Sequence, residues 1–295
     1  MGHILRMQFI RVPIICGLLF LCSCISVQKL KTNYLASSFE SAIESLYSQP
    51  DPELVKEALP SFLILLDSLI LSSPDNAKLL YAGTLAYGTY CQAFLSNEED
   101  IKRAAKLYAK AKEYGFRLLN QESNLYNITE SSFSEFEDQL KLATHVDVPY
   151  LFATSSAWLG WILSNSGSME AIADLPKAIS MINRVVELDE KYNNGAAHLV
   201  FGIYFAAQPR GAGQDLEKSK RHFDRAVELG GDGNLLPIVT FAEYYARATL
   251  DESLFANLLT KAVEMDIESR PDIRLLNEIA LERANFLMEN KEDFF

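Results

Sequence analysis

Apolar residues recur along this chain at intervals of three and four, with polar residues between them. This spacing places apolar side chains on one face of an α-helix. No stretch alternates apolar and polar residues for long enough to predict a strand. We therefore expect an all-α protein with helices near residues 36–48, 51–72, 76–95, 98–119, 131–142, 148–166, 173–188, 194–207, 215–229, 235–248, 251–265 and 272–290.

A seven-residue phrase, INRVVEL in its clearest copy, returns along the chain at residues 108–114, 182–188, 223–229 and 259–265. Its small residue recurs after 41 and then 36 residues, from Val185 to Ala226 to Ala262. A repeat period of this size predicts stacked supersecondary units rather than one globular enzyme core.

Each phrase fits the second helix of a helix-turn-helix unit. Tyr108 and Ala111 follow Ala104 by four and seven positions, and this spacing places the three residues on one helix face. The predicted first helices carry a glycine inside an apolar run, which we expect to admit a neighbouring backbone: Gly83, Gly160 and Gly202. The pattern is typical of tetratricopeptide repeats. However, 17 to 21 residues separate each glycine from the next small position, where the standard repeat has about 12, so we expect elongated helices or insertions.

Local signals predict where helices begin and end. Starts are indicated by Asp51-Pro52, Ser73-Pro74-Asp75 and Asp251, and stops or turns by Gly115, Gly230-Gly231 and Gly233. Residues 120–147 are the least regular part, because few apolar residues precede Leu140. We expect this segment to be an insertion packed on the outside, or a long loop.

The N-terminal residues have the pattern of a secretory signal. Arg6 and Arg11 precede an apolar stretch that ends at Leu21-Cys22-Ser23-Cys24. These four residues are similar to a bacterial lipobox, with Cys24 as the lipidated residue. We expect a lipoprotein signal peptide over 1–23, a lipidated tether over 24–35 and a helical domain over 36–295. The alternative is an uncleaved anchor helix, for which the apolar stretch is short.

The chain is acidic, with 27 Lys and Arg against 39 Asp and Glu and a net charge of −12. Loss of Arg6 and Arg11 with the signal makes this −14. Such a chain is a poor partner for nucleic acid or anionic lipid, so we expect membrane contact through the lipid anchor only. Cleavage would leave Cys24 and Cys91, which excludes a disulfide framework within one chain and a cysteine-based zinc site. Cys91 fits a buried small hydrophobe.

The sequence carries no signature of catalysis, of a cofactor or of a bound metal. It has no metalloprotease His pair, phosphate-binding lysine loop or serine elbow. His145 and Asp147 lie two positions apart, which is a weak indication of a metal site. Ordinary surface or core residues are the better interpretation of the histidines of the mature chain. The segment 211–213 before a helix start fits a turn better than an anion cradle. Arg210 beside it is a lone cation next to an apolar helix, and we keep it as a candidate contact residue.

Aromatic residues gather at helical spacing on the predicted first helices. The candidates for contact with a ligand or partner are Tyr87, Tyr90, Trp158, Trp161, Tyr204 and Tyr244. One interpretation is packing between helices. The other is that hydroxyl and indole groups line a cavity for an apolar or amphipathic ligand, since a purely structural core would more often use Leu or Ile.

Longer stretches are similar to a known family, namely residues 74–76, 87–94, 104–114, 209–213, 215–218, 240–246 and 276–280. They resemble the T-component of tripartite ATP-independent periplasmic (TRAP) transporters, the tetratricopeptide lipoprotein also called TatT, over roughly residues 36–295. The resemblance implies a helical periplasmic lipoprotein that self-assembles as a trimer and docks the solute-binding subunit. It also implies a part in passing hydrophobic or amphipathic ligands, and it brings no catalytic residues.

We therefore expect a non-enzymatic accessory component of a TRAP-type transporter. The alternative is a scaffold lipoprotein that mediates protein–protein contacts in the cell envelope. A hydrolase on a helical frame has no nucleophile–base signature to support it. Ile25 and Ser26 follow Cys24 without an Asp retention signal, which favours the outer membrane.

Overall fold

A computed structural model describes residues 42–43, 45–95, 98–121, 124–211 and 213–295. Within these ranges every regular element is helical, which confirms the all-α prediction. The longer helices are α2 (Pro52–Ser72), α3 (Ala77–Phe94), α4 (Ile101–Leu119), α5 (Phe133–Leu140), α6 (Val148–Ser164), α8 (Leu175–Asp189), α9 (Tyr192–Ala207), α10 (Leu216–Gly230), α13 (Glu252–Val263) and α14 (Arg274–Glu289). The signal peptide, Cys24 and the tether lie outside the described residues, as does most of the expected helix 36–48.

The shorter elements are α7 (Met169–Ala173), α11 (Leu236–Thr240), α12 (Arg247–Thr249) and the turns η1 (Glu98–Asp100), η2 (Ile128–Glu130), η3 (His145–Asp147), η5 (Ile267–Ser269), η6 (Pro271–Ile273) and η7 (Lys291–Asp293). The predicted helix 235–248 contains a π-helical turn, η4 (Phe241–Ala246), between α11 and α12. Such turns occur mostly as single bulges in α-helices and are frequent at functional sites.

Side-chain caps begin several helices where the sequence predicts them. The carboxylates of Asp51 and Asp251 accept hydrogen bonds from the N–H groups of Leu54 and Leu254, at 3.0 and 2.9 Å. Gly115 is a different case, because it lies inside α4 and is buried, so the stop predicted there is wrong. A Cβ at Gly115 would lie 2.7 Å from Thr154 Oγ1, so this glycine permits close packing of α4 and α6.

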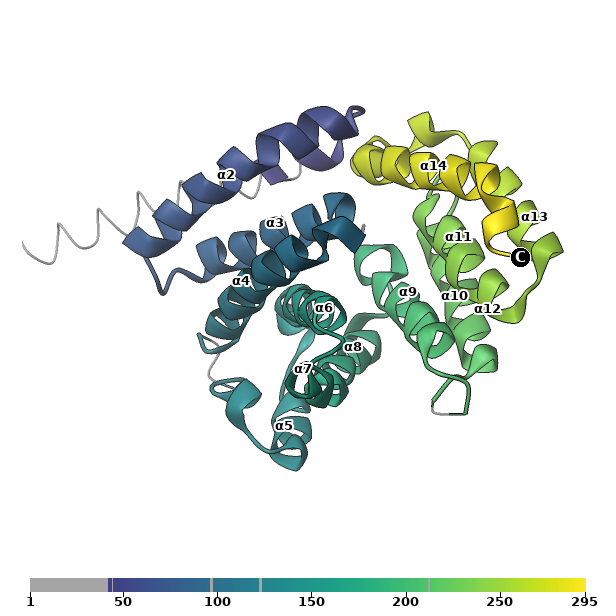
Figure 1. Ribbon diagram of the computed structural model, residues 1–295. Helices are drawn as coiled ribbons and strands as arrows, with labels where there is room; N and C mark the ends of the chain where they lie inside the picture. The colour runs from purple at the N-terminus through teal and green to yellow at the C-terminus, as the bar shows by residue number, and fades with distance from the viewer. Residues whose placement is uncertain (1–41, 44, 96–97, 122–123, 212) are drawn as a thin grey trace, which may run out of the picture.

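Consecutive helices pack side by side, from α3 through α4 and α6 to α8 and from α9 to α10, in a curved arrangement (Figure 1). The recurring small positions are fully or almost fully buried: Ala104, Ala111, Ala178, Val185, Ser219, Ala226 and Ala262. Burial of this kind fits helices in close contact. The tetratricopeptide-like repeat arrangement itself stays a prediction.

The glycines of the predicted first helices face aromatic rings of neighbouring helices. A Cβ at Gly160 would lie 2.3 Å from the ring of Tyr108, and one at Gly202 would lie 2.9 Å from the ring of Phe223. The expectation that these glycines admit a neighbouring backbone is therefore wrong. At Gly160 and Gly202 a side chain fills the space instead, and in both cases it belongs to the large residue four positions after a small one, Tyr108 after Ala104 and Phe223 after Ser219.

Residues 124–147 pack more closely than the sequence suggests. Leu125, Ile128 and Phe136 are fully buried, and the Phe136 ring lies edge-on to Trp158 at a centroid distance of 6.4 Å. Lys177 of α8 secures the segment by donating hydrogen bonds to the carbonyls of Thr129 and Ser131. The segment is an insertion packed against α8, and the expected lack of apolar anchors before Leu140 is wrong.

The helices α2 and α14, which lie near opposite ends of the described chain, meet. Leu275 of α14 is 1% exposed and belongs to the same buried cluster as Val55 and Leu59 of α2. Figure 1 shows α14 in yellow close to the end of α2. The curved stack therefore turns back on itself.

Candidate functional site

Three of the predicted aromatic residues lie in the core. Tyr87 and Tyr90 of α3 are 4% and 3% exposed, and Trp158 of α6 is 1% exposed. The Trp158 indole N–H donates to Asp174 Oδ2 at 2.9 Å, and the guanidinium of Arg103 donates to the Tyr90 hydroxyl at 3.2 Å. These side chains have packing partners and satisfied polar atoms.

Asp67 of α2 organises the contact between α2, α3 and α4. Its carboxylate accepts hydrogen bonds from the hydroxyls of Tyr87 and Tyr114, both at 2.7 Å, and pairs with the ammonium of Lys110. Burial is the main cause that raises the pKa of both tyrosines above the ordinary tyrosine value, and the hydrogen bond to Asp67 is the second. This cluster supports the fold.

The other four predicted contact residues are more accessible. Trp161 is half-buried, with Lys112 Nζ 3.3 Å from its ring centroid. Tyr204 is half-buried against the edge of Phe205, and Tyr244 in the π-helical turn is 38% exposed. Arg210 is exposed and donates to the carbonyl of Ala248 at 3.3 Å, at the end of α12. The seven candidates therefore do not form one site.

A cluster of tyrosines from four segments is not evident from the sequence. Tyr47, Tyr81 of α3, Tyr150 of α6 and Tyr192 at the start of α9 are all half-buried. The rings of Tyr81 and Tyr150 meet edge to face, with centroids 5.4 Å apart. The hydroxyls of Tyr81 and Tyr192 lie 3.5 Å apart, and Phe152 of α6 packs edge-on to Tyr192 at 5.6 Å. We call these five side chains the tyrosine cluster.

An unusual backbone turn positions Tyr192. The next three residues, Asn193, Asn194 and Gly195, have φ values of +48°, +57° and +79°, in the left-handed region. Asn and Gly are the residues that adopt this conformation at low cost. The Asn194 side chain accepts a hydrogen bond from Arg270 at 3.2 Å, which fixes the turn from outside.

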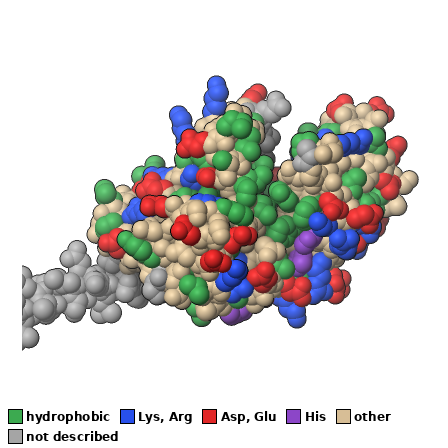
Figure 2. All heavy atoms as spheres, turned by 90° about the horizontal axis from the view of Figure 1, so that it is seen from below, with side chains coloured by type: hydrophobic (Ala, Val, Ile, Leu, Met, Phe, Trp, Pro, Cys, Tyr) green, Lys and Arg blue, Asp and Glu red, His purple; other side chains and the backbone are tan. Residues whose placement is uncertain are grey.

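The face seen from below is hollowed between two protruding parts, and hydrophobic side chains gather in the hollow (Figure 2). Acidic and basic side chains are scattered over the protruding parts around it. An exposed apolar area inside a polar rim is the usual form of a binding surface on a soluble protein.

Two histidines that lie 24 positions apart in the sequence meet between α9 and α10. His198 Nδ1 and His222 Nδ1 are 2.9 Å apart, and His198 Nε2 lies 3.4 Å from a carboxylate oxygen of Glu190. The rings of Phe201 and Phe205 flank His222 at centroid distances of 4.9 and 5.7 Å. Burial and nearby positive charge lower the pKa of His222 to about 4.

The remaining candidates for chemistry have structural roles. Asp147 accepts hydrogen bonds from the N–H and hydroxyl of Thr144, and His145 is 71% exposed. Cys91 is fully buried, and burial raises the pKa of its thiol to about 12, so the buried-hydrophobe interpretation is confirmed. No group of three or more His, Cys, Asp or Glu side chains suited to a metal occurs in the described ranges.

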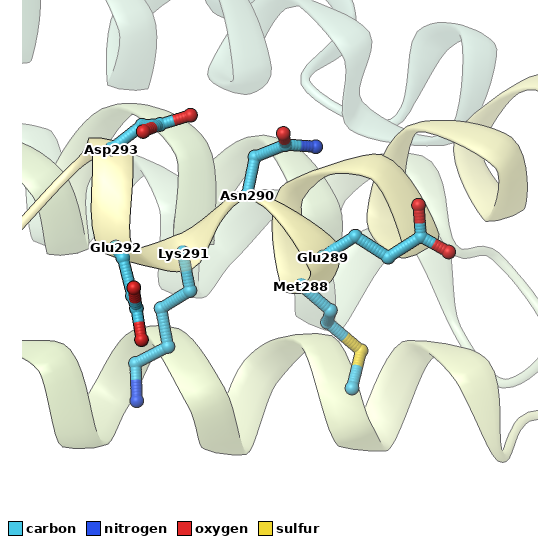
Figure 3. Close-up of a pocket in the computed structure, with 6 residues that line it drawn as sticks. All are labelled: Met288, Glu289, Asn290, Lys291, Glu292 and Asp293. Atoms are coloured by element: carbon cyan, nitrogen blue, oxygen red, sulfur yellow. The ribbon is translucent and has the colours of Figure 1, made fainter.

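One surface depression lies at the C-terminal end of α14. It measures about 340 Å³ and is lined by the consecutive residues 288–293. Figure 3 shows their side chains diverging rather than pointing to a common centre. Lys291 in this group pairs with Glu252 at 2.6 Å. We assign no site to it.

The fold defines an all-α protein built from packed helices. The family of TRAP transporter T-components matches the chain over residues 48–295, and the chain belongs to this family. It therefore has an accessory role in a TRAP transporter, in a family that is not one of enzymes. A protein of Treponema pallidum (strain Nichols), described as uncharacterized, is 27% identical over 266 residues, which cover 84% of this chain and 81% of the relative. In the described part of the chain, no helix is both long enough and apolar enough to span a membrane.

Proposed function

We propose that this protein is a lipid-anchored periplasmic subunit that docks the solute-binding protein of a TRAP-type transporter and binds or passes an apolar or amphipathic ligand. The protein would self-associate and be tethered through Cys24. Family membership supports the partner, and the lipobox-like sequence supports the anchor.

The tyrosine cluster is the observation that carries the ligand part of this proposal. Its rings come from α3, α6, α9 and the segment around Tyr47, and they are half-buried rather than enclosed, so they present apolar surface together with hydroxyl groups. A small set of oriented polar groups on an apolar surface is typical of ligand sites. We propose Trp161, Tyr204 and Tyr244, which are also partly accessible, as further residues for partner or ligand contact.

An interface of this composition should depend mainly on apolar and aromatic contacts. We therefore expect docking to be only moderately sensitive to salt, since screening weakens charge pairs and leaves apolar contacts unaffected. Arg210, exposed on the loop before α10, would contribute a rim contact.

The test is co-purification of the mature protein with the solute-binding protein encoded next to it. Trp161→Ala and Tyr204→Ala should weaken capture, and Tyr126→Ala is the matched control because Tyr126 is an exposed aromatic on a different segment. The proposed transporter function is wrong if the wild-type protein neither captures that partner nor retains a lipid-like molecule on extraction.

A scaffold lipoprotein is the second candidate, and the burial of Tyr87, Tyr90 and Trp158 favours it, because packing alone accounts for these three side chains. Capture of the solute-binding protein with no ligand retained would support this scaffold function at the transporter.

A further inference from the structure

Among the described residues, the hydroxyls of Tyr81 and Tyr192 share one hydrogen bond, so one of their two protons is available for donation to a bound molecule. Two hydroxyl groups in contact can share one hydrogen bond, in which one donates and the other accepts. In the described part of the chain, the contact at 3.5 Å is the only hydrogen bond that either hydroxyl makes. That distance exceeds the usual O–H···O distance of about 2.7–2.8 Å, so even the shared bond is weak.

Both groups remain donors over the physiological pH range. Burial is the main cause that raises the pKa of Tyr81 and of Tyr192 above the ordinary tyrosine value. The neighbouring Tyr192 raises the pKa of Tyr81 further, and Asp189 adds to the rise at Tyr192, where the hydrogen bond with Tyr81 acts in the opposite direction. A pair of phenols that cannot ionise is complementary to one oxygen atom with two lone pairs. An acceptor placed between them would replace one long contact by two hydrogen bonds of normal length.

The surroundings indicate what kind of molecule carries that oxygen. The rings of Tyr150 and Phe152 pack edge-on to Tyr81 and Tyr192 and offer apolar surface beside the two hydroxyls. The charged side chain whose field reaches Tyr192 is Asp189, which is negative. A carboxylate held between the hydroxyls would be repelled by Asp189, whereas a neutral carbonyl would not.

We infer that Tyr81 and Tyr192 together bind the carbonyl oxygen of a neutral amphipathic molecule, an ester or amide, whose hydrocarbon part lies on Tyr150 and Phe152. This inference rests on the proposed ligand-binding function and names the ligand class for it. Tyr192 is held in place for this role by the left-handed turn that follows it.

The test uses the mature protein and two probes that differ in their end group, methyl decanoate and decanoate, with binding followed by calorimetry. We expect the ester to bind more tightly than the acid. Tyr81→Phe and Tyr192→Phe should each weaken ester binding about five- to tenfold. They should leave decanoate binding within about twofold of the wild type. Tyr126→Phe, on an exposed turn, is the matched control.

Both variants keep the aromatic ring, so circular dichroism and thermal unfolding should match the wild type. Equal ester affinity in the wild type and both variants would overturn the inference, as would tighter binding of decanoate than of the ester. Either result leaves the proposed function standing. If neither probe binds and extraction yields no lipid-like molecule, the ligand part of the proposed function fails as well.

Discussion

The Nδ1 atoms of His198 and His222 lie 2.9 Å apart, and the two rings are tilted by 36°. In the tautomer that places the proton of His198 on Nε2, this proton faces the carboxylate of Glu190 at 3.4 Å, and His198 Nδ1 accepts from His222. This hydrogen bond joins α9 to α10. It requires that the two rings are not both doubly protonated.

We expect the protein to lose stability as the pH falls from about 6.5 to about 4. Burial, and then the charges of His198, Arg221 and Lys218, lower the pKa of His222 to about 4. The unfolded chain therefore binds a proton at this position that the folded chain does not bind in that pH window. Because His222 is half-exposed, the loss should be about 1–2 kcal/mol.

Urea unfolding at pH 7.5, 6 and 4.5 measures this effect. His222→Gln should reduce the loss, while His145→Gln, a change at an exposed histidine, should leave it as in the wild type. Identical pH profiles for the wild type and His222→Gln would contradict the assignment.

Two glycines in helix interiors should respond to alanine with opposite signs. At Gly160 a Cβ would lie 2.3 Å from the Tyr108 ring, so Gly160→Ala should cost about 1–3 kcal/mol. At Gly88 nothing lies within 4 Å of the added Cβ, so Gly88→Ala should stabilise α3 by about 0.5–1 kcal/mol. Thermal unfolding of the two variants decides the matter. A stabilising Gly160→Ala would show that the ring of Tyr108 can move.

Ala226→Trp should destabilise the protein severely, by roughly 3 kcal/mol or more, because Ala226 is fully buried and a large ring would overpack the helix contact. Ala262→Trp should behave alike, since Ala262 is also fully buried. Ala207→Trp, at the exposed end of α9, is the control. Wild-type melting temperatures for both buried variants would mean that the repeat phase is wrong.

Asp67→Asn should destabilise the contact between α2, α3 and α4 by about 2–3 kcal/mol, because an amide offers one acceptor oxygen where the carboxylate serves Tyr87, Tyr114 and Lys110. Asp138→Asn removes an exposed carboxylate that pairs with exposed Lys141 and should change stability little. Equal losses of stability for the two substitutions in chemical unfolding would contradict the assignment that Asp67 organises the contact between the three helices.

Cys24→Ala should abolish incorporation of labelled fatty acid in cells and leave a soluble or uncleaved protein. The reason is that Leu21-Cys22-Ser23 directly precede Cys24 and follow a basic and then an apolar segment, as in a lipoprotein signal peptide. Cys91→Ala is the control, since its buried thiol lies in α3. Labelling that persists in Cys24→Ala would show that the lipid is attached elsewhere or not at all.

The helices and many of their ends could be predicted, because apolar spacing and capping residues act within a few positions. Asp51 and Asp251 cap as the sequence indicates. Gly115 shows the limit, since a glycine can serve a neighbouring helix as well as end its own. Only the packed structure shows that the side chain of Thr154 occupies the space.

The candidate site was harder to predict, because its contacts join distant residues. Tyr81 and Tyr192 lie 111 positions apart, and His198 and His222 lie 24 apart on different helices. Which face of a helix meets which neighbour depends on crossing angles that no local pattern encodes. Residue type alone also does not distinguish a contact residue from a core residue. The indole N–H of Trp158 has its hydrogen-bond partner, Asp174, inside the core.

The position of Leu275 has a consequence for folding. In an open array of helical units, each unit contacts only its neighbours, and the ends can fray one at a time. Here α14 contributes to the same hydrophobic core as α2, so fraying of either helix exposes apolar surface on the other. The chain should therefore unfold cooperatively, and removal of α14 should loosen α2. Insertion or deletion of a helical pair would break the same contact. The contact between α2 and α14 therefore fixes the number of helices that the array can hold.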